Sequence, residues 1–272
     1  MKPKRNLIQN FLLGAVLLAL PFASQAQFIY TTNNGAITIV QYTGAGGAVT
    51  IPNPVGAFPV TTIASDAFLP NYTVTSVNIG TNVTTIDANA FFQCYYLTSV
   101  SIPASVTNIG VGPFYDCQSL TTISVSAANL YYTNVNQVLF NKALTSLIQF
   151  PTGTGGSYTL PATVTNIGAA FVGNILTSIS VPPANLYFTN VSGVLFSKDL
   201  TVLVSYPGSR GGSYVVPGTV TTILGSAFEY SPSLGSVTIG TNVTSIGYAA
   251  FFDCASLTAI TVNATNAFYS ST

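Results

Sequence analysis

The sequence contains no histidine and no tryptophan, and only 4% of its 272 residues are charged. The missing histidine excludes Ser–His and Cys–His nucleophile pairs, as well as metal sites that need an imidazole ligand. Six basic side chains are balanced by six acidic ones, so the chain lacks the basic stripe that nucleic-acid binding requires. Hydrophobic residues still make up 48% of the chain, which is typical of a folded protein and not of a disordered polyelectrolyte.

Positions 1–26 have the three parts of a secretory signal peptide. Basic residues lie within positions 2–5, an apolar run follows over positions 11–20, and Ser24 and Ala26 are small residues suited to cleavage after Ala26. The apolar run is shorter than the ~20 residues that a membrane-spanning helix needs. The sequence therefore predicts an exported protein, secreted or held at the cell surface, with no integral membrane segment after cleavage. Export leaves three basic against six acidic side chains, in a compartment where disulfides can form.

A repeat unit, most often of 23 residues, fills the rest of the chain. Its first segment follows the pattern L-x-x-[VI]-x-[VI], its second V-T-x-I and its third A-F-x-x-C. Alternating apolar residues in the first segment predict a short strand with one buried face. Apolar residues at every third position of the last segment suit a short helical or 3-10 turn. The centres of the predicted strands are Val49, Val77, Val100, Ile123, Tyr158, Ile179, Tyr214, Val237 and Ile260.

These segments predict a β-rich solenoid of about nine coils, in which short parallel strands stack and are joined by short helical or 3-10 turns. A single coil has too few apolar side chains to offset its conformational entropy, so stacking must complete the core. We expect an N-terminal cap over residues 27–48, with a hairpin turn at Asn34-Gly35. The solenoid itself is expected over residues 49–272.

Two of the coils are longer than the others, and they are copies of each other. Residues 129–140 match residues 185–196, and each copy is followed by a lysine-containing turn and a glycine-rich turn. We interpret each as a wide coil that carries a β-hairpin, and we call the 23-residue units narrow coils. Residues 260–269 repeat the start of the wide pattern shortly before Thr272, so the sequence predicts that the last coil is truncated.

The pattern L-T-S-V-x-I-P-x-x-V-T-x-I-G-x-x-A-F-x-x-C resembles the BspA-like leucine-rich repeats of bacterial surface proteins. The Val-Leu-Phe-x-Lys segments, with Gly-Ser-Tyr-x-x-Pro downstream, resemble the long-repeat variant of that family, and the resemblance covers about residues 37–272. It implies a leucine-rich repeat solenoid in a secreted or surface-exposed binding protein, often one used in adhesion, and it implies no catalytic residue. One departure is the turn at residues 167–171, which is one residue shorter than its counterparts.

The cysteines and carboxylates do not suggest a reaction centre. Cys94, Cys117 and Cys254 share one repeat position, where we expect buried free thiols. A Cys94–Cys117 disulfide is the alternative, because these two residues lie one coil apart. Asp116 and Asp253 share the preceding position but are several strands apart, too far for the paired carboxylates of a glycosidase, and no other acid lies in register with them. The sequence thus predicts a non-enzymatic protein without a cofactor or a metal.

The outward positions of the predicted strands are almost all small hydroxyl residues. Side chains alternate along a strand, so the x positions of L-x-x-[VI]-x-[VI] point away from the core. The leading hypothesis is weak, repeated binding of an extracellular protein or glycan. The alternatives are a structural surface coat without a discrete ligand, and a Thr/Ser array that orders water as ice-binding solenoids do; plain solvated strand residues would show the same pattern. The predicted binding residues are Thr98, Ser99, Ser101, Thr121, Thr122, Ser124, Thr177, Ser178 and Ser180.

Overall fold

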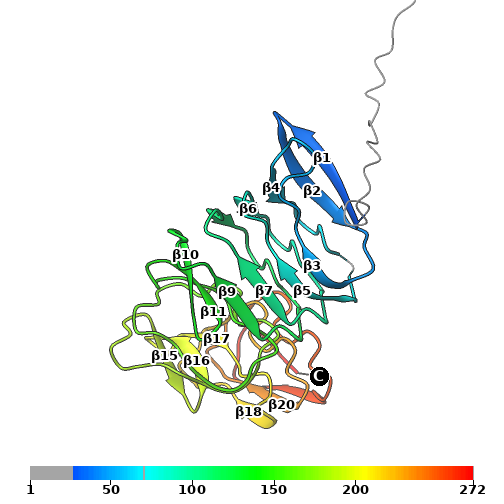
Figure 1. Ribbon diagram of the computed structural model, residues 1–272. Helices are drawn as coiled ribbons and strands as arrows, with labels where there is room; N and C mark the ends of the chain where they lie inside the picture. The colour runs from blue at the N-terminus through cyan, green and yellow to red at the C-terminus, as the bar shows by residue number, and fades with distance from the viewer. Residues whose placement is uncertain (1–26, 70, 272) are drawn as a thin grey trace, which may run out of the picture.

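The coils have two sides on which strands of neighbouring narrow coils stack in register (Figure 1). Figure 1 shows the computed structural model, which describes residues 27–69 and 71–271. The predicted signal peptide, residues 1–26, lies outside the described residues. On the first side, a parallel sheet contains β3 (Gly47–Thr50), β5 (Val74–Asn78), β7 (Ser99–Ile102) and β9 (Thr122–Val125).

All nine predicted strand centres lie in strands on this first side. The later strands are β13 (Gly155–Thr159), β14 (Ile175–Ser180), β18 (Gly212–Val215), β20 (Leu234–Ile239) and β22 (Ala259–Val262). Within each sheet the predicted centres pair with one another in parallel register, as Val49–Val77–Val100–Ile123, Tyr158–Ile179 and Tyr214–Val237–Ile260. This confirms the predicted solenoid of stacked parallel strands.

The V-T-x-I segments form the second side. Their strands pair in parallel, and they are β4 (Val60–Ile63), β6 (Thr85–Ile86), β8 (Asn108–Ile109), β19 (Thr222–Ile223) and β21 (Ser245–Ile246). β2 (Ala36–Tyr42) begins this stack and pairs antiparallel with β1 (Phe28–Asn33). The turn between β1 and β2 holds Asn34 at φ 49° and Gly35 at φ 77°, as a tight hairpin requires. The predicted N-terminal hairpin is therefore confirmed.

Each wide coil folds as a three-stranded antiparallel unit, which confirms the predicted hairpins. The first unit contains β10 (Tyr132–Val135), β11 (Val138–Asn141) and β12 (Leu147–Gln149). The second unit contains β15 (Phe188–Val191), β16 (Val194–Ser197) and β17 (Val202–Ser205). β17 also pairs in parallel with β19, so the second unit continues into the second side of the next narrow coils.

The middle strand of each wide coil separates two parts of the hydrophobic core. Leu139 of β11 belongs to the cluster that extends from the N-terminal hairpin, whereas Val138 and Phe140 belong to a central cluster. Side chains that alternate along a strand point to opposite faces, which explains the division. β16 is placed in the same way between the central cluster and a C-terminal one. Because these strands have core on both faces, the Val-Leu-Phe segment is apolar at every position.

The wide coils also interrupt the first side, where the sequence predicts uninterrupted stacking. The N–H of Val125, in β9, donates to Asn134 Oδ1 (2.8 Å), and the N–H of Ile179, in β14, donates to the carbonyl of Gly193 (2.7 Å). These backbone donors are satisfied by the hairpins. In the described part of the chain, β9 therefore does not pair with β13, and β14 does not pair with β18. The nine strands form three sheets, of four, two and three strands.

The A-F-x-x-C segments form single hydrogen-bonded turns with bonds of the 3-10 type, and none of these turns continues into a helix. The N–H of Cys94 donates to Phe91 O (3.3 Å), and the N–H of Leu97 donates to Cys94 O (3.0 Å). Asn89 and Gln93 both have φ of 56°, in the left-handed region, which stops a right-handed turn from continuing. Residues 27–69 and 71–271 accordingly contain no α-helix.

Candidate binding surface

Six of the nine predicted binding residues lie together on the first side. Ser99 of β7 pairs with Thr122 of β9, and Ser101 pairs with Ser124. Their side chains point outward because the alternating residue Val100 is buried in the core. Thr98 and Thr121 directly precede these two strands and are exposed.

The other three predicted residues lie apart from this group. Thr177, Ser178 and Ser180 belong to β14, in the separate two-stranded sheet. The second wide-coil hairpin packs beside them, because a Cβ built on Gly193 would lie only 2.8 Å from Ser178 Cβ. The continuous outward face therefore comprises β3, β5, β7 and β9, and we call it the outer face.

Some of the predicted hydroxyls hold neighbouring coils together. Each donates to a backbone carbonyl one coil earlier, namely Thr98 to Thr75 (2.8 Å), Thr121 to Thr98 (3.3 Å), Ser124 to Val100 (3.2 Å) and Thr177 to Gly156 (3.0 Å). Within residues 27–69 and 71–271, no hydrogen bond engages the side chains of Ser99, Ser101, Thr122, Ser178 and Ser180. These hydroxyls are available to a ligand, whereas the first group has a structural role.

A groove of about 580 Å³ runs along one edge of the outer face. It lies where β3, β5, β7 and β9 end and the chain turns toward the second side. Its floor includes Ile51, Ile79 and Ile102, which are buried. Its polar lining residues are Thr50, Asn53, Asn78, Thr81, Ser101 and Ser126. We call it the strand-end groove.

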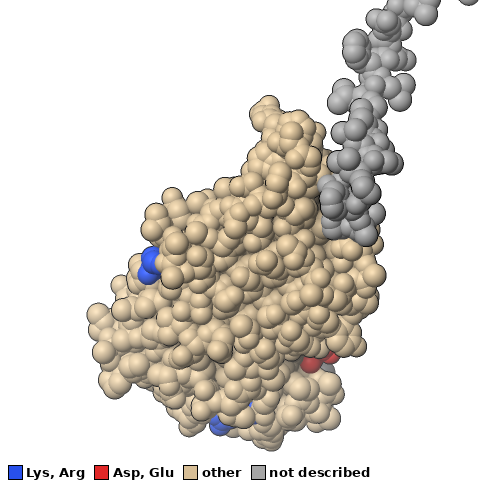
Figure 2. Space-filling model, viewed as in Figure 1, with Lys and Arg blue, Asp and Glu red and all other residues tan. Residues whose placement is uncertain are grey.

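The outer face carries little charge to steer a partner. Figure 2 has the viewpoint of Figure 1, and no Lys, Arg, Asp or Glu atom is visible over β3, β5, β7 and β9. Two of the basic side chains lie in the wide coils instead. Lys142 Nζ donates to Asn129 O (2.6 Å), and Lys198 Nζ donates to Asn185 O (2.6 Å). A partner of the outer face must therefore be held by hydrogen bonds and apolar contact.

A second cluster, absent from the predicted sites, joins coils that are far apart in the sequence. Tyr115 OH donates to the Glu229 carboxylate, and Tyr230 OH donates to Asp116 Oδ2 (2.9 Å). Asp116 is 2% exposed and Glu229 is 5% exposed. We call these four residues the clasp. Glu229 is not in register with Asp116, but the fold places both carboxylates in this cluster from coils far apart in the sequence.

The bend of the solenoid explains how the clasp forms. At each wide coil a hairpin stands between neighbouring strands, while the turns remain in contact. Across the first wide coil, Thr152 Oγ1 donates to Cys117 O (2.5 Å), and the N–H of Gly153 donates to Leu120 O (2.8 Å). The coils therefore spread on the strand sides and stay close on the turn side. The chain curves so that its later coils return behind the earlier ones, as Figure 1 shows.

The sequence did contain a signal for the clasp. Tyr115 and Glu229 occupy the same repeat position, and Asp116 and Tyr230 occupy the next one. Hydroxyl and carboxylate are thus exchanged between two copies of the same turn. The exchange predicts hydrogen bonds between the two turns only when the turns are known to face each other.

The clasp is suited to holding two coils together. Burial and the hydrogen bond to Glu229 raise the pKa of Tyr115, and burial and the hydrogen bond to Asp116 raise the pKa of Tyr230. Both phenols are therefore protonated donors at neutral pH. The two carboxylates are too deeply buried for a substrate to reach them. Among the described residues, no group of three Cys, Asp or Glu side chains is placed to hold a metal ion.

The three cysteines are free thiols, as expected from their shared repeat position. Cys94 and Cys117 are buried, and Cys254 is half-buried. Cys117 Sγ donates to Phe91 O (3.1 Å), and Cys254 Sγ donates to Phe228 O (3.0 Å), so the same position makes the same contact in two coils.

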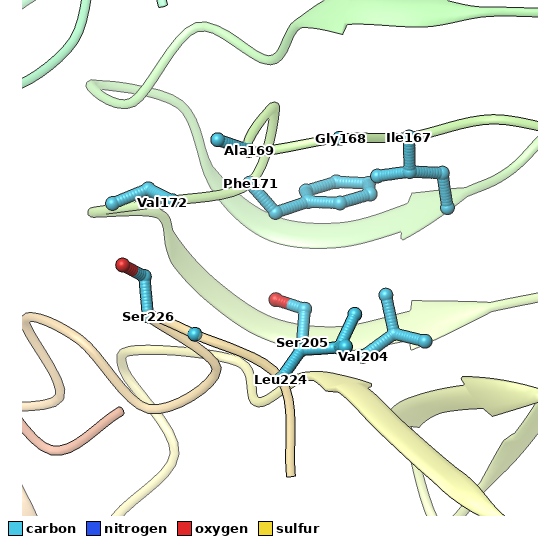
Figure 3. A pocket seen from close by; sticks show the side chains of 10 residues that line it. Ile167, Gly168, Ala169, Phe171, Val172, Val204, Ser205, Leu224 and Ser226 are labelled. Atoms are coloured by element: carbon cyan, nitrogen blue, oxygen red, sulfur yellow. The ribbon is translucent and has the colours of Figure 1, made fainter. Parts of the chain in front are cut away.

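The shortened turn at residues 167–171 leaves a small cavity (Figure 3). Figure 3 shows Ile167 and Phe171 facing Ser205 and Ser226 from later coils across this space. Its volume is about 20 Å³, which is room for about one water molecule. This space beside the shortened turn is too small to hold a ligand larger than water.

The repeats identify the family to which the chain belongs. The family described as BspA type leucine rich repeat region matches residues 61–192 and 209–271, in six copies. These matches cover more than half of the chain, and the protein is therefore a member of the BspA-type leucine-rich repeat family. Among residues 27–69 and 71–271, no helix has the length and apolar character needed to cross a membrane.

Solved structures of a pneumococcal antigen and of several leucine-rich repeat proteins are similar to this chain. The pneumococcal vaccine antigen PcpA is 24% identical, with a TM-score of 0.47 over 87% of this chain and 69% of its own. A leucine-rich repeat protein from Eubacterium ventriosum is 22% identical, with a TM-score of 0.47 over 89% and 71%. The T. pallidum leucine-rich repeat protein is 21% identical, with a TM-score of 0.43 over 86% and 89%. No curated protein matches the chain.

Proposed function

We propose that this protein is exported and binds an extracellular protein or glycan, without catalysis, through its outer face. The observation that carries the proposal is the continuous, uncharged and hydroxyl-rich surface over four strands in register. Asn78, Ser101 and Ser124, for example, form one row across β5, β7 and β9. The export signal expected at residues 1–26 supports an extracellular location.

Repetition is the property that makes this surface suitable for binding. Interface hot spots are usually Trp, Tyr or Arg, and the hydroxyl rows consist of much smaller side chains. Each contact with a partner is therefore weak. Equivalent contacts on successive strands add up, as in multivalent binding, when the partner is itself extended or repetitive.

The bend of the solenoid favours the outer face over the inner side. Solenoid proteins often bind ligands on a concave surface. Here the concave side is the turn side, and the clasp fills part of it with contacts between Tyr115 and Glu229 and between Asp116 and Tyr230. The outer face is the regular surface that stays open to a partner.

A double substitution tests the proposal. Ser101→Arg with Ser124→Arg places two bulky charges on the outer face, and Ser180→Arg is the matched control on β14. All three positions are exposed. Ser101→Arg and Ser180→Arg should each change the free energy of unfolding by less than about 0.5 kcal/mol. Ser124→Arg also removes the hydrogen bond to Val100 O and should cost about 0.5–1.5 kcal/mol. The purified proteins are then compared on immobilised extracellular-matrix proteins and on a glycan array.

The unmodified protein and the Ser180→Arg control should bind, and the double variant should not. Equal binding by all three proteins would place the partner elsewhere, with the wide-coil hairpins around Lys142 and Lys198 as the next surface to test. Absence of binding by the unmodified protein to every probe would also contradict the proposal.

A further inference from the structure

We infer that the strand-end groove binds a neutral oligosaccharide, an inference that rests on the proposed function and narrows its ligand to an uncharged glycan. The groove volume of about 580 Å³ lies within the usual range of small-molecule sites. Its lining comes from four successive coils, so it presents a long, repeated surface and not a single isolated pocket.

Four of the six polar side chains of the groove are not used by the protein itself, whereas Asn53 Nδ2 donates to Thr81 Oγ1. In the described part of the chain, no hydrogen bond engages the side chains of Thr50, Asn78, Ser101 and Ser126. A hydroxyl both donates and accepts, and an amide offers two donors and a carbonyl acceptor. Sugar hydroxyls also donate and accept, so they match this set without any charge.

The apolar part of the lining fits the other half of a sugar. Pro52 and Pro103 are half-buried and offer apolar surface to the groove, whereas Ile51, Ile79 and Ile102 are buried beneath it. A pyranose ring has apolar C–H faces and a polar edge of hydroxyls, so it can contact both kinds of surface together. The groove and a sugar ring therefore both combine apolar surface with hydrogen-bonding groups.

Two other classes of ligand fit the groove less well. A sulfated or sialylated glycan needs cations, and the groove lining is made of uncharged residues. A folded protein partner needs large anchors, and the residues described as lining the groove include no Trp, Tyr or Arg. A neutral glycan can be recognised without cations and without large anchor side chains.

The groove is also rigid and periodic. A Cβ built on Gly80 would lie 2.9 Å from Ile51 O, so glycine allows the first two coils to meet closely here. Asn78 and Ser101 are paired on adjacent strands, and adjacent strands lie about 4.8 Å apart. This spacing is similar to the length of one sugar ring, so successive rings of an extended chain meet equivalent positions.

The chain supplies a matched control for this groove. Residues 79–84 and 239–244 have the same sequence, Ile-Gly-Thr-Asn-Val-Thr. Asn78 precedes the first copy and lines the groove, whereas Thr238 precedes the second copy, on β20 in a different sheet. Asn78→Arg should therefore obstruct the groove, and Thr238→Arg should place the same charge in the same repeat position away from it.

The test uses one array of neutral gluco-, manno- and galacto-oligosaccharides together with sialylated and sulfated glycans. We expect the protein to bind neutral glycans and Asn78→Arg to weaken the affinity for the best of them by about tenfold or more, measured by titration calorimetry. Ser101→Arg, a second obstruction of the groove, should act in the same direction. Thr238→Arg should keep the affinity within about twofold. Circular dichroism and thermal melting confirm that each variant is folded.

Four outcomes would overturn the inference. Preference for sulfated or sialylated glycans would show that the ligand class is wrong. Neutral binding that survives Asn78→Arg and Ser101→Arg would show that the groove is not the site. Binding to a matrix protein alone, lost in the Ser101→Arg, Ser124→Arg double variant, would reject the glycan and leave the proposed function standing. Binding to neither glycans nor matrix proteins would reject both.

Discussion

Val100 and Phe140 are both buried in the core, but different neighbours bury them. Val100, in a narrow coil, lies between Val77 and Ile123 in a parallel sheet. Phe140 lies on β11 of a wide coil, between the antiparallel strands β10 and β12. A narrow coil extends the cluster that it joins, whereas a wide coil ends one cluster and begins the next.

This difference shows how a chain of parallel repeats changes direction. Identical narrow coils can only continue the stack along its axis. A hairpin inserted on the strand sides, with the turns still in contact, rotates the next coils about the turn side. Two such insertions are enough to bring Tyr115 and Glu229 together, although 114 residues separate them in the sequence.

The largest expected effect concerns the middle strand of a wide coil. Phe196 of β16 is fully buried in the C-terminal cluster, so Phe196→Ala should lower the free energy of unfolding by about 3–5 kcal/mol. Urea denaturation followed by circular dichroism measures this loss. Val237→Ala, in a narrow coil, removes a smaller side chain and should cost less. A loss below about 1 kcal/mol at Phe196 would mean that β16 does not separate two clusters as described.

The next effect concerns the attachment of a wide coil to the narrow coils before it. Asn129 is fully buried; its Nδ2 donates to the carbonyls of Pro103 (2.8 Å) and Val106 (2.9 Å), and its Oδ1 accepts two backbone N–H groups. Asn129→Ala should cost about 2–4 kcal/mol, because several buried groups lose their partners. Asn266 makes the same four bonds but is only half-buried, so water can replace them in Asn266→Ala. Equal losses in the two variants would contradict this explanation.

The clasp gives a smaller effect on stability and a distinct effect on shape. Tyr115→Phe with Tyr230→Phe removes both hydroxyl-to-carboxylate hydrogen bonds, at about 0.5–1.5 kcal/mol each, so the double variant should lose about 1–3 kcal/mol. The double variant should be less stable, and small-angle scattering should show a larger radius of gyration. Tyr248→Phe is the control, because Tyr248 is 94% exposed. A double variant with unchanged stability and radius would show that the bend does not depend on the clasp.

The positions of the strands could be predicted because they depend on contacts within one coil and with its nearest neighbours. Alternation around Val100 and Ile123 is enough to assign both strands and their register. The turn geometry was harder, because left-handed residues such as Asn89 are not evident from apolar spacing. The separation of Ser180 from Ser124 and the formation of the clasp depend on how the wide coils rotate the stack, and that rotation has no local pattern in the sequence.

The clasp also predicts how stability changes in alkaline solution. The pKa values of Tyr115 and Tyr230 are raised in the folded protein above the ordinary value of 10.0. Above that pH the unfolded chain releases phenolic protons that the folded chain keeps, so the free energy of unfolding should fall as the pH rises. Other buried tyrosines contribute too, and the Tyr115→Phe, Tyr230→Phe double variant should therefore show a shallower fall. Urea titrations between neutral and alkaline pH measure both slopes, and parallel slopes would exclude the clasp as a source.

The smallest expected effect distinguishes the half-buried thiol from the two buried ones. Cys94 and Cys117 are buried, whereas Cys254 is half-buried. Burial raises the pKa of both thiols, so labelling of the native protein by a disulfide reagent should be slow at both sites. Cys254 should nevertheless react first, and Cys94 and Cys117 should react only after unfolding. Cys254→Ser should then remove labelling of the native protein. Labelling of Cys117 at the rate of Cys254, or a Cys94–Cys117 disulfide in a non-reducing peptide map, would show that the inner coils open or that their thiols are oxidised.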